Sequence, residues 1–161
     1  MIRKSTLNDK NIIQQLMLIC FGDKNDLEPY ENLTDRYYLY FADNVLVAMT
    51  GLTSNSEYDH LEIDWTCTHP QYRHKGYMQA LFAEMLKDAH DDIYCSCWRL
   101  PQKDKANLYT LMSMFGFKEV IHTRIHWKVP YNCFRNYDGG CTCCVGRNCE
   151  CYEDLYMRKS V

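Results

Sequence analysis

Residues 72–82, YRHKGYMQALF, place basic side chains and a glycine directly before a stretch of helical hydrophobic spacing. The first N–H groups of a helix have no partner within the helix and carry partial positive charge, so they favour an anion such as pyrophosphate. Gly76 lacks a Cβ and would let the backbone approach that anion closely, while Arg73 and Lys75 add charge. The segment is therefore a candidate phosphate site. The alternative is a solvated basic loop before an amphipathic helix.

A pair of carboxylates, Glu62 and Asp64, precedes this loop in the strand-like stretch HLEIDWTC. Residues two apart on a strand share a face, so both carboxylates are expected on one side, with Ile63 and Trp65 on the opposite, core side. A carboxylate placed in this way can act as a general base. The alternative is that both carboxylates are solvated on an open face.

The chain has ten cysteines, several of them in a cysteine-rich insert, residues 131–151, that precedes the expected last strand. Two Cys-x-Cys pairs, Cys141/Cys143 and Cys149/Cys151, flank a bend that contains a glycine. Four thiolates from such a bend could hold zinc in a tetrahedral site. Free thiols and disulfides are the other possible states, and the spacing does not decide among the three.

Length and composition predict one globular domain over residues 1–161, because 47% hydrophobic residues suffice for a core. The net charge of -3 argues against a nucleic-acid partner, which would call for a basic excess. No apolar run reaches the roughly 18 residues of a membrane span, so no membrane partner is expected. The N-terminal residues lack the apolar centre of a signal peptide, so we expect a cytoplasmic protein with reduced thiols.

Strand and helix patterns follow one another in the order β-α-α-β-β-β-α-β-α-β-β. Two β-rich runs flank Asp43-Asn44, a pair typical of a hairpin turn. Hairpins beside β-α-β connections predict a mixed sheet with helices on both faces. The expected helices cover residues 7–22, a stretch that ends near Ala89, and residues 105–115. The acidic segment 23–35 is expected to be a short helix or a loop.

The loop motif Arg73-x-x-Gly76, after a strand and Pro70, resembles the pyrophosphate loop of the GNAT superfamily of N-acetyltransferases, whose pattern is Gln/Arg-x-x-Gly-x-Gly/Ala. CTHPQYRHKGYMQALFAEML has the family's strand–loop–helix context, and KANLYTLMSMFGFKEV is similar to its next helix, which ends in Gly-Phe. MIRKSTLNDKNIIQQL and DLYMRK also fit, so the resemblance covers nearly the whole chain except 131–151. It implies an α/β (α+β) fold with a GNAT-like, mostly antiparallel sheet of six to seven strands.

The resemblance also implies acetyl-CoA as cosubstrate. The backbone of Thr66 and Thr68 would pair with its pantetheine arm, and Asn107 would lie near its lower end. Met78 departs from the family's Gly or Ala, and its side chain either crowds the cofactor or points into the core. The pyrophosphate would be held by the Arg73 side chain and by the backbone N–H groups of His74, Lys75, Gly76, Tyr77 and Met78.

Acetyl transfer to an amine needs a base, because an alkyl ammonium with a pKa near 10 is protonated at neutral pH. Glu62 falls where several members of the family carry their catalytic glutamate, and Asp64 is the second candidate. Many relatives protonate the departing thiolate with a Tyr at the position of Met112. Tyr109 lies one turn earlier and could substitute, although it could equally be a packing aromatic.

These observations favour an enzyme that moves an acetyl group from acetyl-CoA to a primary amine of a small molecule or peptide by direct attack. Two alternatives stay open: a non-catalytic acyl-CoA-binding or regulatory module, and a protein that responds to metal or redox state through its cysteine cluster. The acidic segment 23–35 would favour a cationic acceptor. A monomer and a homodimer are both compatible with the sequence.

Overall fold

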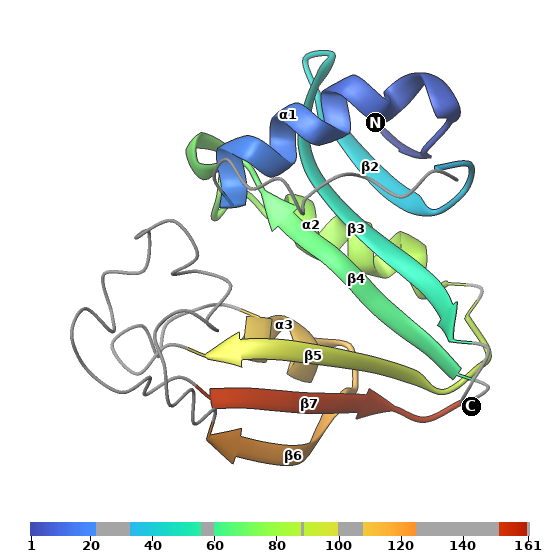
Figure 1. Cartoon of the computed structure of the whole chain (residues 1–161), viewed down its shortest axis with the longest axis vertical. Coiled ribbons are helices and arrows are strands. Elements are labelled where there is room, and N and C mark those ends of the chain that lie inside the picture. The colour runs from blue at the N-terminus through green and yellow to red at the C-terminus, as the bar shows by residue number, and fades with distance from the viewer. Residues whose placement is uncertain (22–32, 56–59, 88, 100–107, 125–151, 161) are drawn as a thin grey trace, which may run out of the picture. The chain divides into compact units, whose positions relative to one another are not determined.

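The computed structural model describes residues 1–21, 33–55, 60–87, 89–99, 108–124 and 152–160 (Figure 1). These residues form seven strands, three α-helices and two short 3-10 helices. They divide into two compact units, residues 1–93 with 159–161 and residues 94–158. Neither unit contains, among its described residues, a helix long and apolar enough to span a bilayer.

The first unit is built on four antiparallel strands in the order β1-β2-β3-β4. Its hairpin turns at Asp43 and Asn44, which both have positive φ, at 48° and 63°. Two such residues in succession make the turn whose twist matches that of the flanking strands, so the predicted hairpin is confirmed. The strands are β1 (Ile2–Lys4), β2 (Tyr37–Ala42), β3 (Val45–Asn55) and β4 (His60–Thr68).

Helix α1 (Lys10–Phe21) covers one face of these strands, and α2 (Tyr77–Met85) covers the other (Figure 1). On the α2 face, the Thr50 hydroxyl lies 3.9 Å from the Met85 sulfur, and the Tyr40 and Tyr77 rings lie 4.5 Å apart. The α1 face carries a hydrophobic core cluster, formed by Ile13, Leu16, Met17, Leu33, Tyr37, Leu39, Leu46, Met49 and Cys67.

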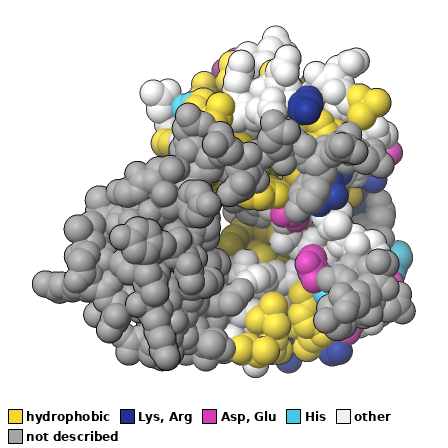
Figure 2. Space-filling view, in the orientation of Figure 1, with side chains coloured by type: hydrophobic (Ala, Val, Ile, Leu, Met, Phe, Trp, Pro, Cys, Tyr) yellow, Lys and Arg dark blue, Asp and Glu magenta, His cyan; other side chains and the backbone are white. Residues whose placement is uncertain are grey.

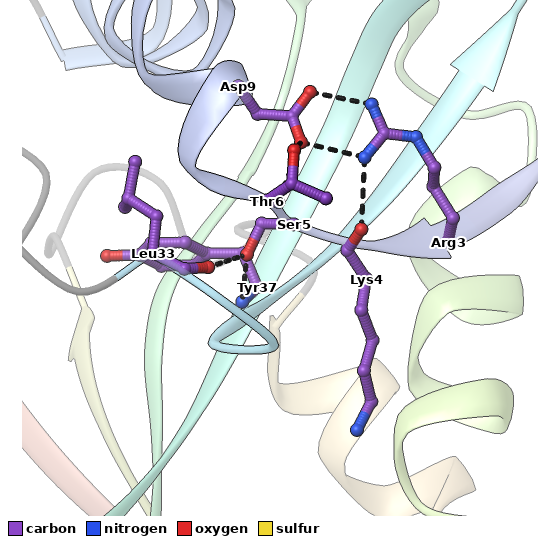
Figure 3. A network of polar contacts seen from close by, with 7 residues as sticks. All are labelled: Arg3, Lys4, Ser5, Thr6, Asp9, Leu33 and Tyr37. Atoms are coloured by element: carbon purple, nitrogen blue, oxygen red, sulfur yellow. Dashed lines mark hydrogen bonds and ion pairs between the residues drawn. The ribbon is translucent and has the colours of Figure 1, made fainter.

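A polar network fixes the start of α1 against the sheet (Figure 3). Arg3 donates two hydrogen bonds, of 2.7 and 2.6 Å, to the buried carboxylate of Asp9 in the short 3-10 helix Leu7–Asp9. These bonds, with further donors from Thr6, hold the pKa of Asp9 well below its ordinary value. The buried Ser5 hydroxyl joins the network to β2, since it donates to the Leu33 carbonyl and accepts from the Tyr37 N–H.

The second unit has the strand order β5-β7-β6, with β6 and β7 antiparallel. Its helix ends at Met114, and Gly116 follows with a φ of 79°, which lets the Phe117 N–H reach back to the Met112 carbonyl at 3.0 Å. This is the glycine C-cap that the sequence predicts. The elements are β5 (Ile93–Arg99), α3 (Leu108–Met114), β6 (Lys118–Arg124) and β7 (Tyr152–Arg158).

The predicted fold class is confirmed by these seven strands, their largely antiparallel pairing and the helices on the two faces of the first unit. The helix expected to run to about Ala89 ends at Met85, with Leu86 as its C-cap. The possible helix in the acidic segment and the insert 131–151 lie largely or wholly outside the described residues. The assignment of the whole chain to one domain stays a prediction.

Candidate active site

The loop between β4 and α2 presents a helix N-terminus toward open space. A 3-10 turn, Pro70–Tyr72, follows β4, and Gly76 caps α2 with φ 79° and ψ 2°. Nothing lies within 4 Å of the position that a Cβ on Gly76 would take. Residues 73–76 are exposed, so the N-terminal end of α2 is accessible to solvent, and the residues present fit a pyrophosphate group.

Two cationic side chains of this loop are exposed and already oriented. The Arg73 Nε donates to the Thr68 carbonyl at 3.3 Å, and the Lys75 ammonium stands 4.9 Å from the centre of the Tyr72 ring. Figure 2 shows acidic and basic side chains interspersed over the described part of one face of the protein. On that face an anion site would depend on local geometry of this kind rather than on a broad basic surface.

Met78 is half-buried, on the side of α2 that the buried Leu81, Phe82 and Met85 share. Residues three, four and seven positions along a helix lie on one face, so the Met78 side chain follows the core stripe. Of the two predicted orientations, crowding the cofactor or pointing into the core, this placement agrees with the second.

Strand β4 is interrupted by a bulge just before the loop. Its register against β3 moves from Met49 opposite Cys67 to Gly51 opposite Asp64, so Trp65 and Thr66 together face one residue, Thr50. Trp65 has φ 41°, a rare value for a residue with a side chain. Bulges bend a strand and re-aim its side chains, often beside active sites.

Because of the bulge, the orientation of Trp65 differs from the predicted one. The sequence placed this residue opposite the carboxylates, but its ring packs edge-on against Phe21 of α1 at 5.7 Å. Asp64 faces the same side, because its partner Gly51 stands opposite Tyr37 of the α1 cluster. Strict alternation fails here because the strand contains one extra residue.

The two predicted carboxylates share this face and differ in their partners. Glu62 Oε1 lies 2.9 Å from His60 Nε2, and its side chain is 48% exposed. Asp64 Oδ2 accepts a 2.8 Å hydrogen bond from Arg36 Nη2, and its side chain is only 22% exposed. Burial raises the pKa of Asp64 above its ordinary value, although Arg36 opposes that shift. The structure thus contains one solvent-accessible carboxylate beside a histidine and one enclosed carboxylate in an ion pair.

Strand β4 also contains Thr66, in the bulge, and Thr68, just before the loop. The Thr66 hydroxyl lies 2.8 Å from the Thr50 hydroxyl, which fixes its side chain, while the Thr68 carbonyl holds Arg73. Both residues are half-buried. The phosphate loop, the bulge and the carboxylates therefore follow one another within residues 60–78 of a single compact unit.

Comparison with known proteins identifies the family to which the chain belongs. Residues 10–117, more than half of the chain, match the sequence model of the Acetyltransferase (GNAT) family. The chain belongs to the GNAT acetyltransferase family. The matched residues include the bulged strand, the phosphate loop and both carboxylates. No curated protein sequence matches the chain significantly.

Solved structures of GNAT proteins share the fold at low sequence identity. A GNAT-family acetyltransferase from Bacillus cereus superposes with a TM-score of 0.68 and 16% identity, over 100% of this chain and 97% of its own. The ribosomal-protein-S18-alanine N-acetyltransferase from Escherichia coli gives a TM-score of 0.65 and 13% identity, over 98% and 91%. N-acetylglutamate synthase from Neisseria gonorrhoeae, complexed with coenzyme A and L-arginine, gives a TM-score of 0.63 and 16% identity. That match covers 99% of this chain and 33% of the synthase chain. These likenesses confirm the predicted GNAT fold.

Several predicted residues of this GNAT protein fall outside the part of the chain that the structure describes. Asn107 and the Cys141–Cys151 cluster lie outside the described residues, as does the side chain of Tyr109, whose backbone is in α3. Met112, at the position of the usual Tyr, is fully buried. Within the described part of the chain, no three His, Cys, Asp or Glu side chains are grouped to hold a metal ion. The zinc site therefore stays a prediction for the insert alone.

Sequence reasoning did not single out Arg36 or His60. His60 could have been found, because it stands two residues before Glu62 on a strand and so shares its face. Arg36 could not, because its contact with Asp64 joins residues 28 positions apart.

Proposed function

We propose that this protein is an N-acetyltransferase that moves an acetyl group from acetyl-CoA to a primary amine by direct attack. The observation that carries the proposal is the pairing, in one compact unit, of an anion-binding helix N-terminus at Gly76 with an accessible carboxylate at Glu62. Membership of the GNAT family supports the same reaction.

The cofactor would bind along the bulged strand and the phosphate loop. Acetyl-CoA supplies the acetyl group as a thioester, whose thiolate is a tolerable leaving group. The exposed Arg73 and Lys75 would neutralise phosphate charge, and Thr66 and Thr68 would pair with the pantetheine arm through their backbone. The phosphates would accept hydrogen bonds from the backbone of His74, Lys75, Gly76, Tyr77 and Met78.

Glu62 is the better placed of the two candidate bases. Its carboxylate is half-exposed, so it can take a proton from the acceptor directly or through a water molecule. The Asp64 carboxylate is more enclosed and already binds the Arg36 guanidinium. We assign Asp64 the role of holding Arg36 and the bulge in place, with Glu62 as the base.

Tyr109 is our candidate for the general acid, on the grounds of its place on α3 one turn before Met112. A Tyr109→Phe variant that retains full turnover would mean that the thiolate departs without a proton from this residue.

The acceptor is proposed to be a primary amine of a small molecule or of a peptide. Two of the structurally similar proteins are named for acceptors that carry an amino group, glutamate and the alanine of ribosomal protein S18. For this chain, the accessible face of β4 next to Glu62 would be the place of the amine.

The test is release of free CoA from acetyl-CoA in the presence of a panel of amines, with products identified by mass. Glu62→Gln should lower turnover by roughly 10²–10⁴-fold while acetyl-CoA affinity stays unchanged. Asp64→Asn is the matched control and should lower turnover far less. A larger loss in Asp64→Asn would transfer the base role to Asp64, and acetyl-CoA binding without release for any amine would favour a non-catalytic module.

A further inference from the structure

A cavity of about 310 Å³ lies in the first unit, away from the candidate active site. Glu84 and Met85, at the end of α2, contribute to its lining, whereas the phosphate loop precedes the first turn of that helix. All of its described lining residues belong to residues 1–93. Small-molecule sites in proteins measure roughly 300–1,000 Å³, so this cavity has room for a small ligand.

The cavity is lined by the face of the sheet that α2 covers. Tyr38 follows Tyr37, which belongs to the α1 cluster, so the Tyr38 ring points to the opposite face. Its partner in β3 is Thr50, whose hydroxyl lies 3.9 Å from the Met85 sulfur of α2. Lys4 of β1 is paired with Tyr38 and shares that face. The two candidate carboxylates face the α1 side, so the sheet separates them from the cavity.

Apolar side chains form half of the described lining. Most of them are half-buried, and Met85 is buried. Removing apolar surface from water is favourable, so a ligand with an apolar part would bind here better than one that is polar throughout. The apolar lining residues are Ile2, Leu52, Leu61, Met85 and Ala89.

Charged side chains of opposite sign come to the cavity from separate elements. Lys4 belongs to β1, Glu84 belongs to α2, and Asp91 stands between α2 and β5. All three are exposed, and within the described residues none of them takes part in an ion pair. The Lys4 ammonium lies 5.5 Å from the centre of the Tyr38 ring. One cation and two carboxylates are therefore present for a ligand.

Arg3, the other charged residue of the lining, is already neutralised. Its guanidinium forms the ion pair with Asp9, at 2.6 Å. Arg3 and Lys4 are successive residues of a strand, so their side chains point to opposite faces. In Figure 3 the Lys4 side chain points away from the Arg3–Asp9 pair.

The signs of these charges indicate the class of ligand. A purely cationic ligand would be repelled by Lys4, and a purely anionic one by Glu84 and Asp91. A small zwitterion satisfies both signs, with its ammonium group beside the two carboxylates and its carboxylate beside Lys4. Hydrogen bonds between charged groups are about twice as strong as neutral ones, so both ends would contribute.

We propose that this cavity binds a small zwitterionic ligand, an α-amino acid with an apolar side chain. The apolar side chain would cover the half-buried carbon surface of Leu52 and Leu61. The site lies on the other face of the sheet from Glu62 and does not depend on the proposed acetyl transfer.

The ligand class is tested with three related compounds. The full-length protein, without acetyl-CoA, is titrated with each, and Kd is read from NMR chemical-shift changes. Leucine carries both charges, leucinamide lacks the carboxylate, and N-acetylleucine lacks the ammonium group. Each missing charge removes a charge-assisted hydrogen bond, so both analogues should bind about ten-fold or more weakly compared with leucine.

Variants of the lining test the position of the site. Lys4→Met keeps the apolar stem of the side chain and removes its charge, so it should weaken leucine binding by about ten-fold or more without weakening leucinamide binding. Asp91→Asn, at a second exposed position, should weaken leucine without weakening N-acetylleucine. Lys118→Met is the matched control, because this exposed lysine of β6 is not part of the lining, and it should keep the parent Kd.

Glu62→Gln separates the cavity from the active site, because the place beside Glu62 would also attract an ammonium group. Leucine should bind this variant with the parent Kd. Three results would overturn the proposal: no saturable binding of leucine, equal Kd values for leucine and leucinamide, or leucine binding that is lost in Glu62→Gln and kept in Lys4→Met. None of these readouts requires acetyl transfer, so the cavity and the proposed enzyme activity can fail independently.

Discussion

Two glycines with the same backbone conformation allow the phosphate loop to be tested against an internal control. Gly76 and Gly116 both have φ 79°, and at both positions an added Cβ would meet nothing within 4 Å. Gly76 caps the start of α2, whereas Gly116 follows the end of α3. An alanine at either position therefore introduces the same backbone strain without a steric clash.

The expected cost in stability is the same for both variants. An alanine held in the left-handed region costs about 1–2 kcal/mol. For a chain of this length, that corresponds to a fall in Tm of about 2–8 °C. The effects on acetyl-CoA should differ, because only Gly76 would lie against the ligand. If relaxation of the strained alanine turns one N–H away from a phosphate, the loss of a charge-assisted hydrogen bond is about 1.5–3 kcal/mol, roughly 10- to 150-fold in Kd.

Calorimetric titration with acetyl-CoA, together with thermal unfolding of the free proteins, separates the two effects. We expect Gly116→Ala to lose stability and keep its Kd, and Gly76→Ala to lose both. Equal Kd values for the two variants, at equal loss of stability, would contradict the view that the Gly76 backbone approaches the pyrophosphate.

Three further predictions concern charged residues. Arg73→Glu should abolish the rise in Tm that acetyl-CoA causes by binding the native state, and a retained rise would remove Arg73 from the phosphate site. Asp9→Asn should lower the unfolding free energy by about 1.5–3 kcal/mol at pH 7, through its bonds to Arg3. Because the pKa of Asp9 is depressed in the folded state, its contribution to the unfolding free energy is present above the unfolded pKa of about 3.9 and is lost as pH falls toward the folded pKa. The unfolding free energies of the variant and the parent, measured by urea titration, should therefore converge in acid. His60→Gln should lower kcat/KM by about five-fold, the equivalent of one hydrogen bond of about 1 kcal/mol; an unchanged kcat/KM would mean that His60 does not position Glu62.

The parts of the fold that follow from local pattern could be predicted from the sequence. The Asp43-Asn44 turn and the glycine cap at Gly116 need only a few neighbouring residues, and the structure has both. The bulge at Trp65 could not be predicted, because it depends on how β4 aligns with β3. A one-residue change in alignment turns a side chain to the other face, and for this reason Trp65 was assigned to the wrong side.

The candidate site likewise contains residues that the sequence predicts and contacts that it does not predict. The phosphate loop, Glu62 and Asp64 stand in one short segment and carry recognisable spacing. The partners that distinguish the two carboxylates come partly from elsewhere, since Arg36 reaches Asp64 across 28 positions of sequence.

The oriented cations of the loop have a consequence for the entropy of binding. A long side chain that becomes fixed when a ligand binds loses rotational freedom worth about 0.5–1.5 kcal/mol. The Arg73 guanidinium is already restrained by the Thr68 carbonyl, and the Lys75 ammonium already rests over the Tyr72 ring. Much of that ordering has therefore taken place during folding. Binding of a polyphosphate here should be opposed by less conformational entropy than binding by freely rotating basic side chains, and removing the Tyr72 ring should make the entropy of binding less favourable while the charge of the loop stays the same.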